Sequence, residues 1–304
     1  MSQLFMTGGS GFIGRHFLND YAHEFSRIVL PLRSAPDFEL PSHVEVKMVT
    51  GKPEEVSSLL KNEPCDYVLN AAGYGVKPND RDASQMKLVN IDLPTQLAKA
   101  ANIVQSKRFV QLGSMSEYLA NGTDIATRET DTVVRNTNSY GGSKAEATQQ
   151  LRKVSESEET EITCLRLFGV FGEGEAPHRL LPSLQSKLSA GETVPMSEGT
   201  QIRDFIYIPD VTSAIFAALT QPERARFTVY NIGSGRGISV REFSKVFCRL
   251  GKYRPEQLNF GSLPMRDTDV SFMVANIEKA NTFLDWRPEW TTETALADYL
   301  SKFH

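Results

Sequence analysis

Residues 7–14 read TGGSGFIG and follow the first short apolar run of the chain. They satisfy Gly-x-Gly-x-x-Gly through Gly9, Gly11 and Gly14, and Gly-x-x-Gly-x-x-Gly when Gly8 is taken as the first glycine. Either spacing lets the backbone approach a pyrophosphate at a helix amino terminus, where unpaired N–H groups and the helix dipole favour negative charge. A tight turn without a ligand is the alternative, but the helical pattern FIGRHFLNDY that follows favours dinucleotide binding.

Further apolar runs alternate with helical patterns along the chain. RIVLPL, VEVKMV, DYVLNAA and RFVQLGS are separated by segments such as PTQLAKAANIVQ, which is typical of βαβ units. We therefore predict an α/β fold, a Rossmann-type doubly wound parallel sheet with a smaller α/β carboxy-terminal substrate lobe. The predicted dinucleotide-binding domain is 1–168, the predicted substrate lobe is 169–304, and residues 203–221 are expected to return to the first domain.

Composition limits the classes of partner. The 304 residues can bury a substantial core, and 40% hydrophobic with 23% charged residues is ordinary for a globular protein. A net charge of −4 gives no general attraction to nucleic acid or to an anionic membrane, and no apolar stretch approaches a membrane span. An anionic ligand must therefore be held by locally placed arginines.

The cysteines indicate a reducing compartment. Cys65, Cys164 and Cys248 are far apart and show no CxxC spacing, so neither a disulfide framework nor a metal site is suggested. With no room for a signal peptide before TGG, we predict a cytoplasmic protein.

The stretch NSYGGSK, residues 138–144, places Tyr140 and Lys144 four positions apart. On a helix these side chains share one face, and a nearby ammonium is expected to lower the phenol pKa by favouring phenolate. Gly141 and Gly142 each cost a helix about 1 kcal/mol relative to alanine, so we expect some group to approach the backbone closely there. Without the upstream glycine motif, a surface Tyr and Lys would be the better interpretation.

Together these motifs resemble the extended short-chain dehydrogenase/reductase family, also called the NAD-dependent epimerase/dehydratase family, over nearly the whole chain. TGGSGFIG resembles its cofactor loop, YGGSK its Tyr-x-x-x-Lys pair, and LGSMSEY the strand end that supplies a catalytic hydroxyl. The resemblance implies a catalytic set of Ser114, Tyr140 and Lys144. Ser114 and Tyr140 would polarise the substrate oxygen, and Lys144 would bind the nicotinamide ribose.

The same resemblance implies the cofactor contacts. They are Gly8, Gly11, Phe12, Ile13, Gly14, Arg33, Ala71, Ala72, Tyr140 and Lys144. Relatives that prefer NAD carry an acidic residue at the end of the second strand, whereas RIVLPLRS lacks one and has Arg33 just beyond. This departure favours NADP, against the alternative that Arg33 is a solvated loop residue.

Downstream segments imply a nucleoside diphosphate sugar as substrate. GTQIRDFIYIPDV and LPMRDTDV resemble family segments whose arginines hold the diphosphate, which carries over to Arg203 and Arg266, with Asp269 on the nucleotide ribose. Tyr74, in the loop AAGYGVKPND, and Ser116 complete the predicted substrate contacts. Relatives commonly pair through two helices, so the resemblance also implies a homodimer.

The pair after Ser114 bears on the reaction. Related sugar-nucleotide 4,6-dehydratases carry Asp-Glu there as acid and base, whereas this chain has Met115 and Ser116, which disfavours dehydration. The favoured reaction is reduction of a 4-keto-6-deoxyhexose at C4, with Tyr140 as acid. A redox-neutral 4-epimerase is the alternative, and a non-catalytic dinucleotide-sensing regulator is a third interpretation. Gly169 and Phe171 replace an asparagine and a tyrosine of relatives, so substrate contacts there are expected to differ.

Overall fold

A computed structural model describes residues 2–77, 79–120, 122–157, 159–222, 225–265 and 270–303. Its largest element is a seven-stranded parallel sheet with the order β10-β6-β5-β4-β1-β2-β3. The strands are β1 (Gln3–Thr7), β2 (Arg27–Leu32), β3 (Val44–Met48), β4 (Tyr67–Asn70), β5 (Arg108–Ser114), β6 (Glu161–Leu167) and β10 (Phe227–Ile232). Strand order reverses between β1 and β4, and the predicted Rossmann-type α/β fold is confirmed.

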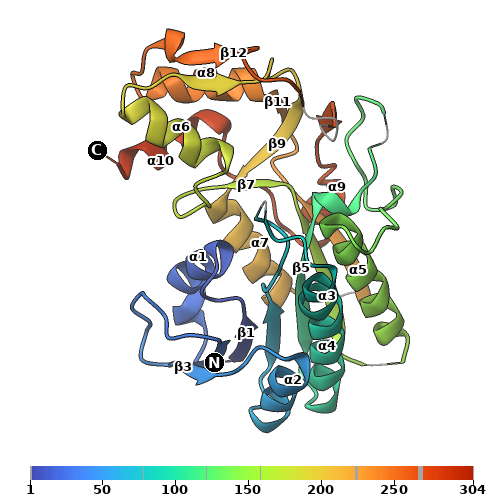
Figure 1. Ribbon diagram of the computed structural model, residues 1–304. Helices are drawn as coiled ribbons and strands as arrows, with labels where there is room; N and C mark the ends of the chain where they lie inside the picture. The colour runs from blue at the N-terminus through green and yellow to red at the C-terminus, as the bar shows by residue number, and fades with distance from the viewer. Residues whose placement is uncertain are drawn as a thin grey trace.

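Helices cover both faces of this sheet (Figure 1). One face carries α1 (Phe12–Tyr21) and α7 (Ile208–Thr220), and the other carries α2 (Pro53–Asn62), α4 (Leu93–Ile103) and α5 (Tyr140–Ser157). Before α4 the chain forms α3 (Ala83–Met86) and a π-helical segment (Lys87–Asp92). Short 3₁₀ turns lie at Ala22–Glu24, Met115–Glu117 and Pro255–Gln257. Within the described ranges, no helix is both long and apolar enough to cross a lipid bilayer.

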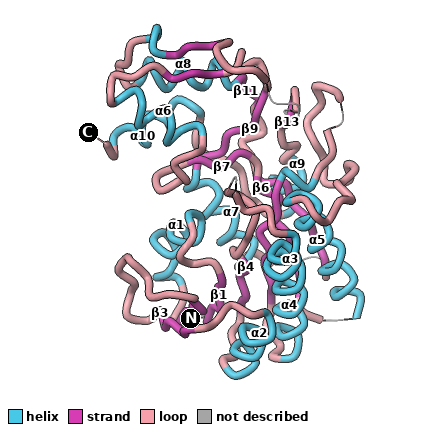
Figure 2. The backbone as a smooth tube through the Cα atoms, viewed as in Figure 1, coloured by secondary structure: helices cyan, strands magenta, loops and turns pink. Residues whose placement is uncertain are grey.

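The smaller lobe is built around β9 (Ile202–Tyr207). This strand pairs with β7 (Gly169–Phe171) and β13 (Phe272–Met273) in parallel and with β11 (Gly237–Ser239) in antiparallel orientation. A separate pair joins β8 (Val194–Met196) to β12 (Leu258–Phe260). The helices of this part are α6 (Leu180–Ser189), α8 (Val240–Leu250) and α10 (Thr292–Ser301), whereas α9 (Glu278–Phe283) lies against β10 of the large sheet. Figure 2 shows the strands of both sheets, in magenta, among these helices.

The two lobes share an apolar core. One cluster of buried side chains runs from α1, β1 and β2 through α7 into β7, α6, α8 and α10, and a second lies between the sheet and α2, α4 and α5. Residues 203–221 divide between the lobes, because β9 pairs in the smaller sheet while α7 lies against α1. β10 also belongs to the large sheet although it follows residue 168. We keep the division at residue 168 as a proposal.

Candidate active site

The glycine loop after β1 is a close-packed turn. Gly8 has a φ of +74°, a left-handed conformation that favours glycine, and a Cβ there would lie 2.5 Å from the backbone N of Ala72. The N–H of Gly11 donates to the Gly8 carbonyl (3.0 Å), and a Cβ on Gly14 would lie 2.7 Å from the Gly9 Cα. The loop therefore brings bare backbone to the start of α1 at the switch point between β1 and β4. This geometry fits the pyrophosphate of a dinucleotide.

The other predicted cofactor residues surround this loop. Phe12 and Ile13 are the half-buried first residues of α1, and Ala71 and Ala72 follow β4 directly, with the Ala71 N–H bonded to the Thr7 carbonyl (3.1 Å). Arg33 is exposed beyond the end of β2, where its side chain covers Gly51.

The structure brings the three predicted catalytic residues together. Ser114 ends β5, and its Oγ accepts a hydrogen bond from the Ser116 N–H (3.1 Å). Tyr140 is the first residue of α5 and is hydrogen-bonded to the Ser114 hydroxyl. Lys144 lies one turn later, only 4% exposed, and its Nζ donates to the Leu112 carbonyl (3.0 Å). The hydroxyl and the phenol thus meet at the carboxyl edge of the sheet, and the amine is bonded two residues earlier on the same strand.

Burial shifts the pKa values of both Tyr140 and Lys144. It raises the pKa of Tyr140, which the hydrogen bond from Ser114 opposes, and it lowers the pKa of Lys144 to about 8. The expectation that Lys144 lowers the phenol pKa is therefore wrong in this structure, because desolvation outweighs the other influences on the phenol and the amine is bound to a backbone carbonyl. Both effects favour the neutral side chains, so Tyr140 stays protonated at neutral pH.

The two glycines of α5 allow close contacts within the protein itself. A Cβ on Gly141 would overlap the Ser116 carbonyl group, and one on Gly142 would overlap that of Asn136. The groups that approach the backbone are therefore protein carbonyls rather than a ligand. Gly141 in particular lets the start of α5 lie against the turn that follows Ser114.

Asn90 is a site residue that the sequence analysis missed. It is fully buried in the π-helical segment, where its Oδ1 accepts from the Tyr74 N–H (2.9 Å) and its Nδ2 donates to the Tyr74 carbonyl (2.8 Å). The same Nδ2 donates to Ser143 Oγ (2.9 Å), on α5. Asn90 therefore holds the loop of Tyr74 over Tyr140, whose ring would contact a Cβ on Gly75. The sequence offered one indication of this role, which is a polar asparagine within the apolar helical pattern KLVNIDLPTQL.

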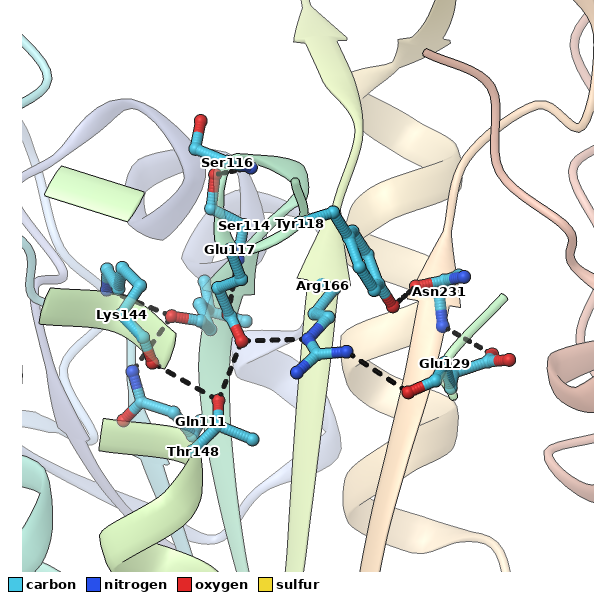
Figure 3. A network of polar contacts seen from close by, with 11 residues as sticks. Gln111, Ser114, Ser116, Glu117, Tyr118, Glu129, Lys144, Thr148, Arg166 and Asn231 are labelled. Carbon is cyan, nitrogen blue, oxygen red and sulfur yellow. Dashed lines mark hydrogen bonds and ion pairs between the residues drawn. The ribbon is translucent and has the colours of Figure 1, made fainter. Parts of the chain in front are cut away.

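In the 3₁₀ turn that follows Ser114, the side chain of the acidic residue, Glu117, points into the protein. Met115 is half-buried and Ser116 is exposed, whereas Glu117 is fully buried. Glu117 accepts from the Ser114 N–H (2.9 Å) and is paired with Arg166 Nε (2.8 Å), as Figure 3 shows. The single carboxylate of this turn therefore cannot meet a substrate beside Ser114. Glu117 and Arg166 were not singled out from the sequence either.

A cleft of about 730 Å³ lies mainly in the smaller lobe, and the three catalytic candidates are not among its lining residues. Its wall includes Val76 and Met115, which are sequence neighbours of Gly75 and Ser114. Arg203, a predicted substrate residue, lines it and donates from Nη1 to the carbonyls of Ile202 (2.9 Å) and Val270 (2.6 Å).

Two residues before α6 also line the cleft. Arg179 is bonded to Glu175 (3.0 Å), and its charge acts on Tyr140 in the direction that lowers the phenol pKa. His178, exposed beside them, is part of the same wall. Arg266 and Asp269, predicted to bind the nucleotide, lie outside the described residues.

Known proteins resemble this chain along nearly its whole length. The dTDP-6-deoxy-L-talose 4-dehydrogenase (NAD(P)(+)) of Kitasatospora kifunensis is 28% identical over 301 residues, covering 96% of this chain and 93% of that protein. The dTDP-L-rhamnose 4-epimerase of Burkholderia thailandensis is 24% identical over 342 residues, covering 97% of this chain and 93% of that protein. The solved structure of MoeE5 in complex with UDP-glucuronic acid and NAD is 25% identical, with a TM-score of 0.84 and 98% of each chain covered.

The family follows from a match of more than half the chain. The model of the NAD dependent epimerase/dehydratase family matches residues 4–233, which include the glycine loop, Ser114, Tyr140 and Lys144. This protein is therefore an enzyme that belongs to the NAD dependent epimerase/dehydratase family.

Proposed function

We propose that this enzyme reduces the ketone of a nucleoside diphosphate 4-keto-6-deoxyhexose at C4, with Tyr140 as the proton donor. The observation that carries the proposal is the turn after Ser114. A hydroxyl and a phenol meet there, at the same carboxyl edge of the sheet as the glycine loop, and the one carboxylate of the turn is buried against Arg166. Eliminating water needs an acid and a base at the sugar, whereas transferring a hydride to a ketone needs one proton donor.

The cleft supports a nucleotide-sugar ligand. Its volume of about 730 Å³ suits a ligand of that size, and Arg203 and Arg179 supply cations to its wall. The similar dehydrogenase and epimerase are named for dTDP-sugars, and the similar solved structure holds a UDP-sugar and NAD. We propose that Arg203 binds the diphosphate, together with Arg266 and with Asp269 on the ribose.

The surface next to the triad favours a 6-deoxy sugar. Val76 follows Gly75, which lies beside the Tyr140 ring, and Met115 follows Ser114, so two segments next to the triad contribute apolar side chains to the cleft. An apolar wall accepts a methyl group, whereas a hydroxyl against it would lose its hydrogen bonds to water. The similar 4-dehydrogenase is likewise named for a 6-deoxy sugar.

The chain's own residues account for the proton and for the position of the ketone. In the proposed complex Ser114 and Tyr140 hydrogen-bond the ketone oxygen, and Lys144 Nζ binds the nicotinamide ribose. The reduced nicotinamide, when bound, supplies the hydride. Tyr140, kept protonated by burial, delivers its proton to the oxygen as negative charge develops there.

An epimerase is the second candidate, because a 4-epimerase from Burkholderia thailandensis is similar to this chain at nearly full length. The deciding experiment follows nicotinamide absorbance while the pure enzyme is given thymidine, cytidine, guanosine and uridine diphosphate 4-keto-6-deoxyhexoses and intact UDP-glucose. Net oxidation of NADPH supports the reductase. Sugar interconversion without net oxidation supports the epimerase. If normal cofactor affinity comes with neither, the result favours the dinucleotide-sensing regulator.

We also propose a preference for NADP, which rests on Arg33. Its side chain is exposed just beyond the carboxyl end of β2, and we propose that it pairs with the 2′-phosphate. Arg33→Ala should weaken NADPH binding about tenfold, the loss of one charge-assisted hydrogen bond, and leave NADH binding unchanged. Nicotinamide fluorescence titrations measure both. Arg249→Ala, an exposed arginine of the smaller lobe, is the control. An unchanged ratio of the two affinities would contradict the preference.

Assembly and location stay proposals. We propose a homodimer, which sedimentation velocity would test, and a cytoplasmic enzyme. The second proposal is supported by the three cysteines, which are all buried and unpaired.

A further inference from the structure

One ion pair lies at each end of the β5–β6 strand pair, and in the second of them Glu117 belongs to the 3₁₀ turn that follows β5. Arg108 pairs with Glu161 (2.7 Å) where both strands begin, and Glu117 pairs with Arg166 (2.8 Å) where they end. Glu161 is one-third exposed, whereas the Glu117 side chain is inaccessible and that of Arg166 is only 5% exposed. Burying two charges costs solvation free energy that their attraction often fails to recover, so such a pair is weak evidence for stability. The second pair calls for another explanation.

Glu117 is bonded to both chain segments that carry the catalytic residues (Figure 3). Its Oε1 accepts the Ser114 N–H (2.9 Å). Its Oε2 lies 2.9 Å from the hydroxyl of Thr148, which is itself 3.2 Å from the carbonyl of Lys144. Because a hydroxyl has one proton, Thr148 shares it between these two oxygens. One carboxylate thus spans the gap between the end of β5 and the first turns of α5.

Arg166 fixes that carboxylate from the opposite side. Its Nε donates to Glu117 Oε2, and its Nη1 donates to the Glu129 carbonyl (3.3 Å). Its guanidinium stacks over the Tyr118 ring, 4.5 Å from the centroid, and the Tyr118 hydroxyl donates to Asn231 Oδ1 (2.6 Å). The carboxylate of Glu117 is therefore bonded on both of its oxygens, to partners that are themselves bonded or packed.

We propose that Glu117 is a positioning residue, which sets the spacing between Ser114 and the turn of α5 that carries Lys144 and Tyr140. The reaction it serves is the one proposed above, and the proposal rests on that function for its kinetic test alone. A misplacement of about 1 Å at a reacting group can cost about a hundredfold in rate, so a rigid link of this kind has a measurable effect.

The charge of Glu117 also acts on the two titrating groups of the site. It raises the pKa of Tyr140 and opposes the lowering of the Lys144 pKa by burial. The other ionisable groups that act on them are Arg179, which lowers the Tyr140 pKa, and Cys164, which raises that of Lys144. Removing the charge of Glu117 should therefore lower both pKa values and move the alkaline limb of the pH–rate profile to lower pH.

Glu117→Gln is the direct test, measured as NADPH oxidation with the 4-keto-6-deoxy sugar nucleotide that the panel identifies. We expect kcat to fall about tenfold, KM for the sugar nucleotide to change less than about twofold, and the alkaline limb to move to lower pH. Glu161→Gln is the matched control, because it breaks the ion pair at the other end of the same strands. It should leave kcat and the pH profile unchanged.

Thr148→Val tests the link without touching the ion pair. The variant keeps the side-chain shape and removes the hydroxyl, so we expect kcat to fall about threefold to tenfold while the alkaline limb stays in place. Ser155→Ala, which removes a hydroxyl bonded to a carbonyl further along α5, is its control. If Glu117→Gln does not fold, Thr148→Val decides: a normal melting temperature with unchanged kcat overturns the proposal.

A titration without sugar separates this proposal from the proposed function. Carbon-13 NMR of protein labelled at the lysine ε-carbon, assigned by the signal missing from Lys144→Met, gives the pKa of Lys144 directly. We expect it to fall in Glu117→Gln relative to wild type and to stay unchanged in Glu161→Gln. If no keto sugar is reduced but this shift is found, the proposed function fails and the coupling of Glu117 to the site stands. An unchanged Lys144 pKa in folded Glu117→Gln would overturn the coupling of Glu117 to the site.

Discussion

Tyr140→Phe should abolish turnover, lowering kcat about a thousandfold, while the affinity for NADPH stays within about twofold of wild type. The phenol is hydrogen-bonded to the Ser114 hydroxyl, and Glu117, which is buried and paired with Arg166, cannot replace it as a proton donor. The ring itself contacts the loop at Gly75, so phenylalanine keeps the packing. Single-turnover NADPH oxidation measures the rate, and fluorescence titration measures the affinity.

Tyr207→Phe is the matched control for this substitution. Tyr207 is 1% exposed, and its hydroxyl donates to Asp298 (2.6 Å) in the smaller lobe, so the variant loses a buried hydroxyl away from the triad. It should lower the melting temperature and leave kcat unchanged. If Tyr140→Phe keeps a near-normal rate, Tyr140 is not the acid and the proposed mechanism fails.

The fold could be predicted because its signals are local. The glycines of residues 7–14 impose a turn that few other residues permit, and strands buried on both faces read as short continuous apolar runs. The spacing of Tyr140 and Lys144 is equally local, since it depends only on the period of a helix. The sequence did not reveal how deeply the phenol is buried. Burial raises the Tyr140 pKa, whereas the sequence predicted a lowered one.

The missed residues depend on contacts between distant segments. Glu117 and Arg166 are 49 positions apart and become partners only through the register of β5 and β6, which sets Gly113 opposite Arg166. Asn90 faces Ser143 only because the π-helical segment packs on α5. A buried charge in the strand EITCLRL was visible in the sequence, but its partner was not. The pattern of Met115 and Ser116 disfavoured dehydration, and the inward-facing Glu117 adds a physical reason.

Lys144→Met should lower kcat about a hundredfold and weaken NADPH binding about tenfold. In the proposed complex the amine, one helical turn from Tyr140, binds the nicotinamide ribose, so its removal should loosen the cofactor and misplace it relative to the phenol. Lys153→Met is the matched control, because it removes an exposed lysine from the same helix. It should change neither quantity, and equal effects of the two substitutions would contradict a role for Lys144.

The same variant should be at least as stable as wild type at pH 7. Burial lowers the pKa of Lys144 from its ordinary 10.5 to about 8, so between these values the unfolded chain binds more protons than the folded one. The cost of burying the ammonium is therefore complete below pH 8 and fades as the pH rises toward 10.5. Melting curves should show Lys144→Met gaining most over wild type near neutral pH and progressively less above pH 8. A variant that melts well below wild type at pH 7 would show instead that the bond from Lys144 Nζ to the Leu112 carbonyl outweighs the solvation that burial removes.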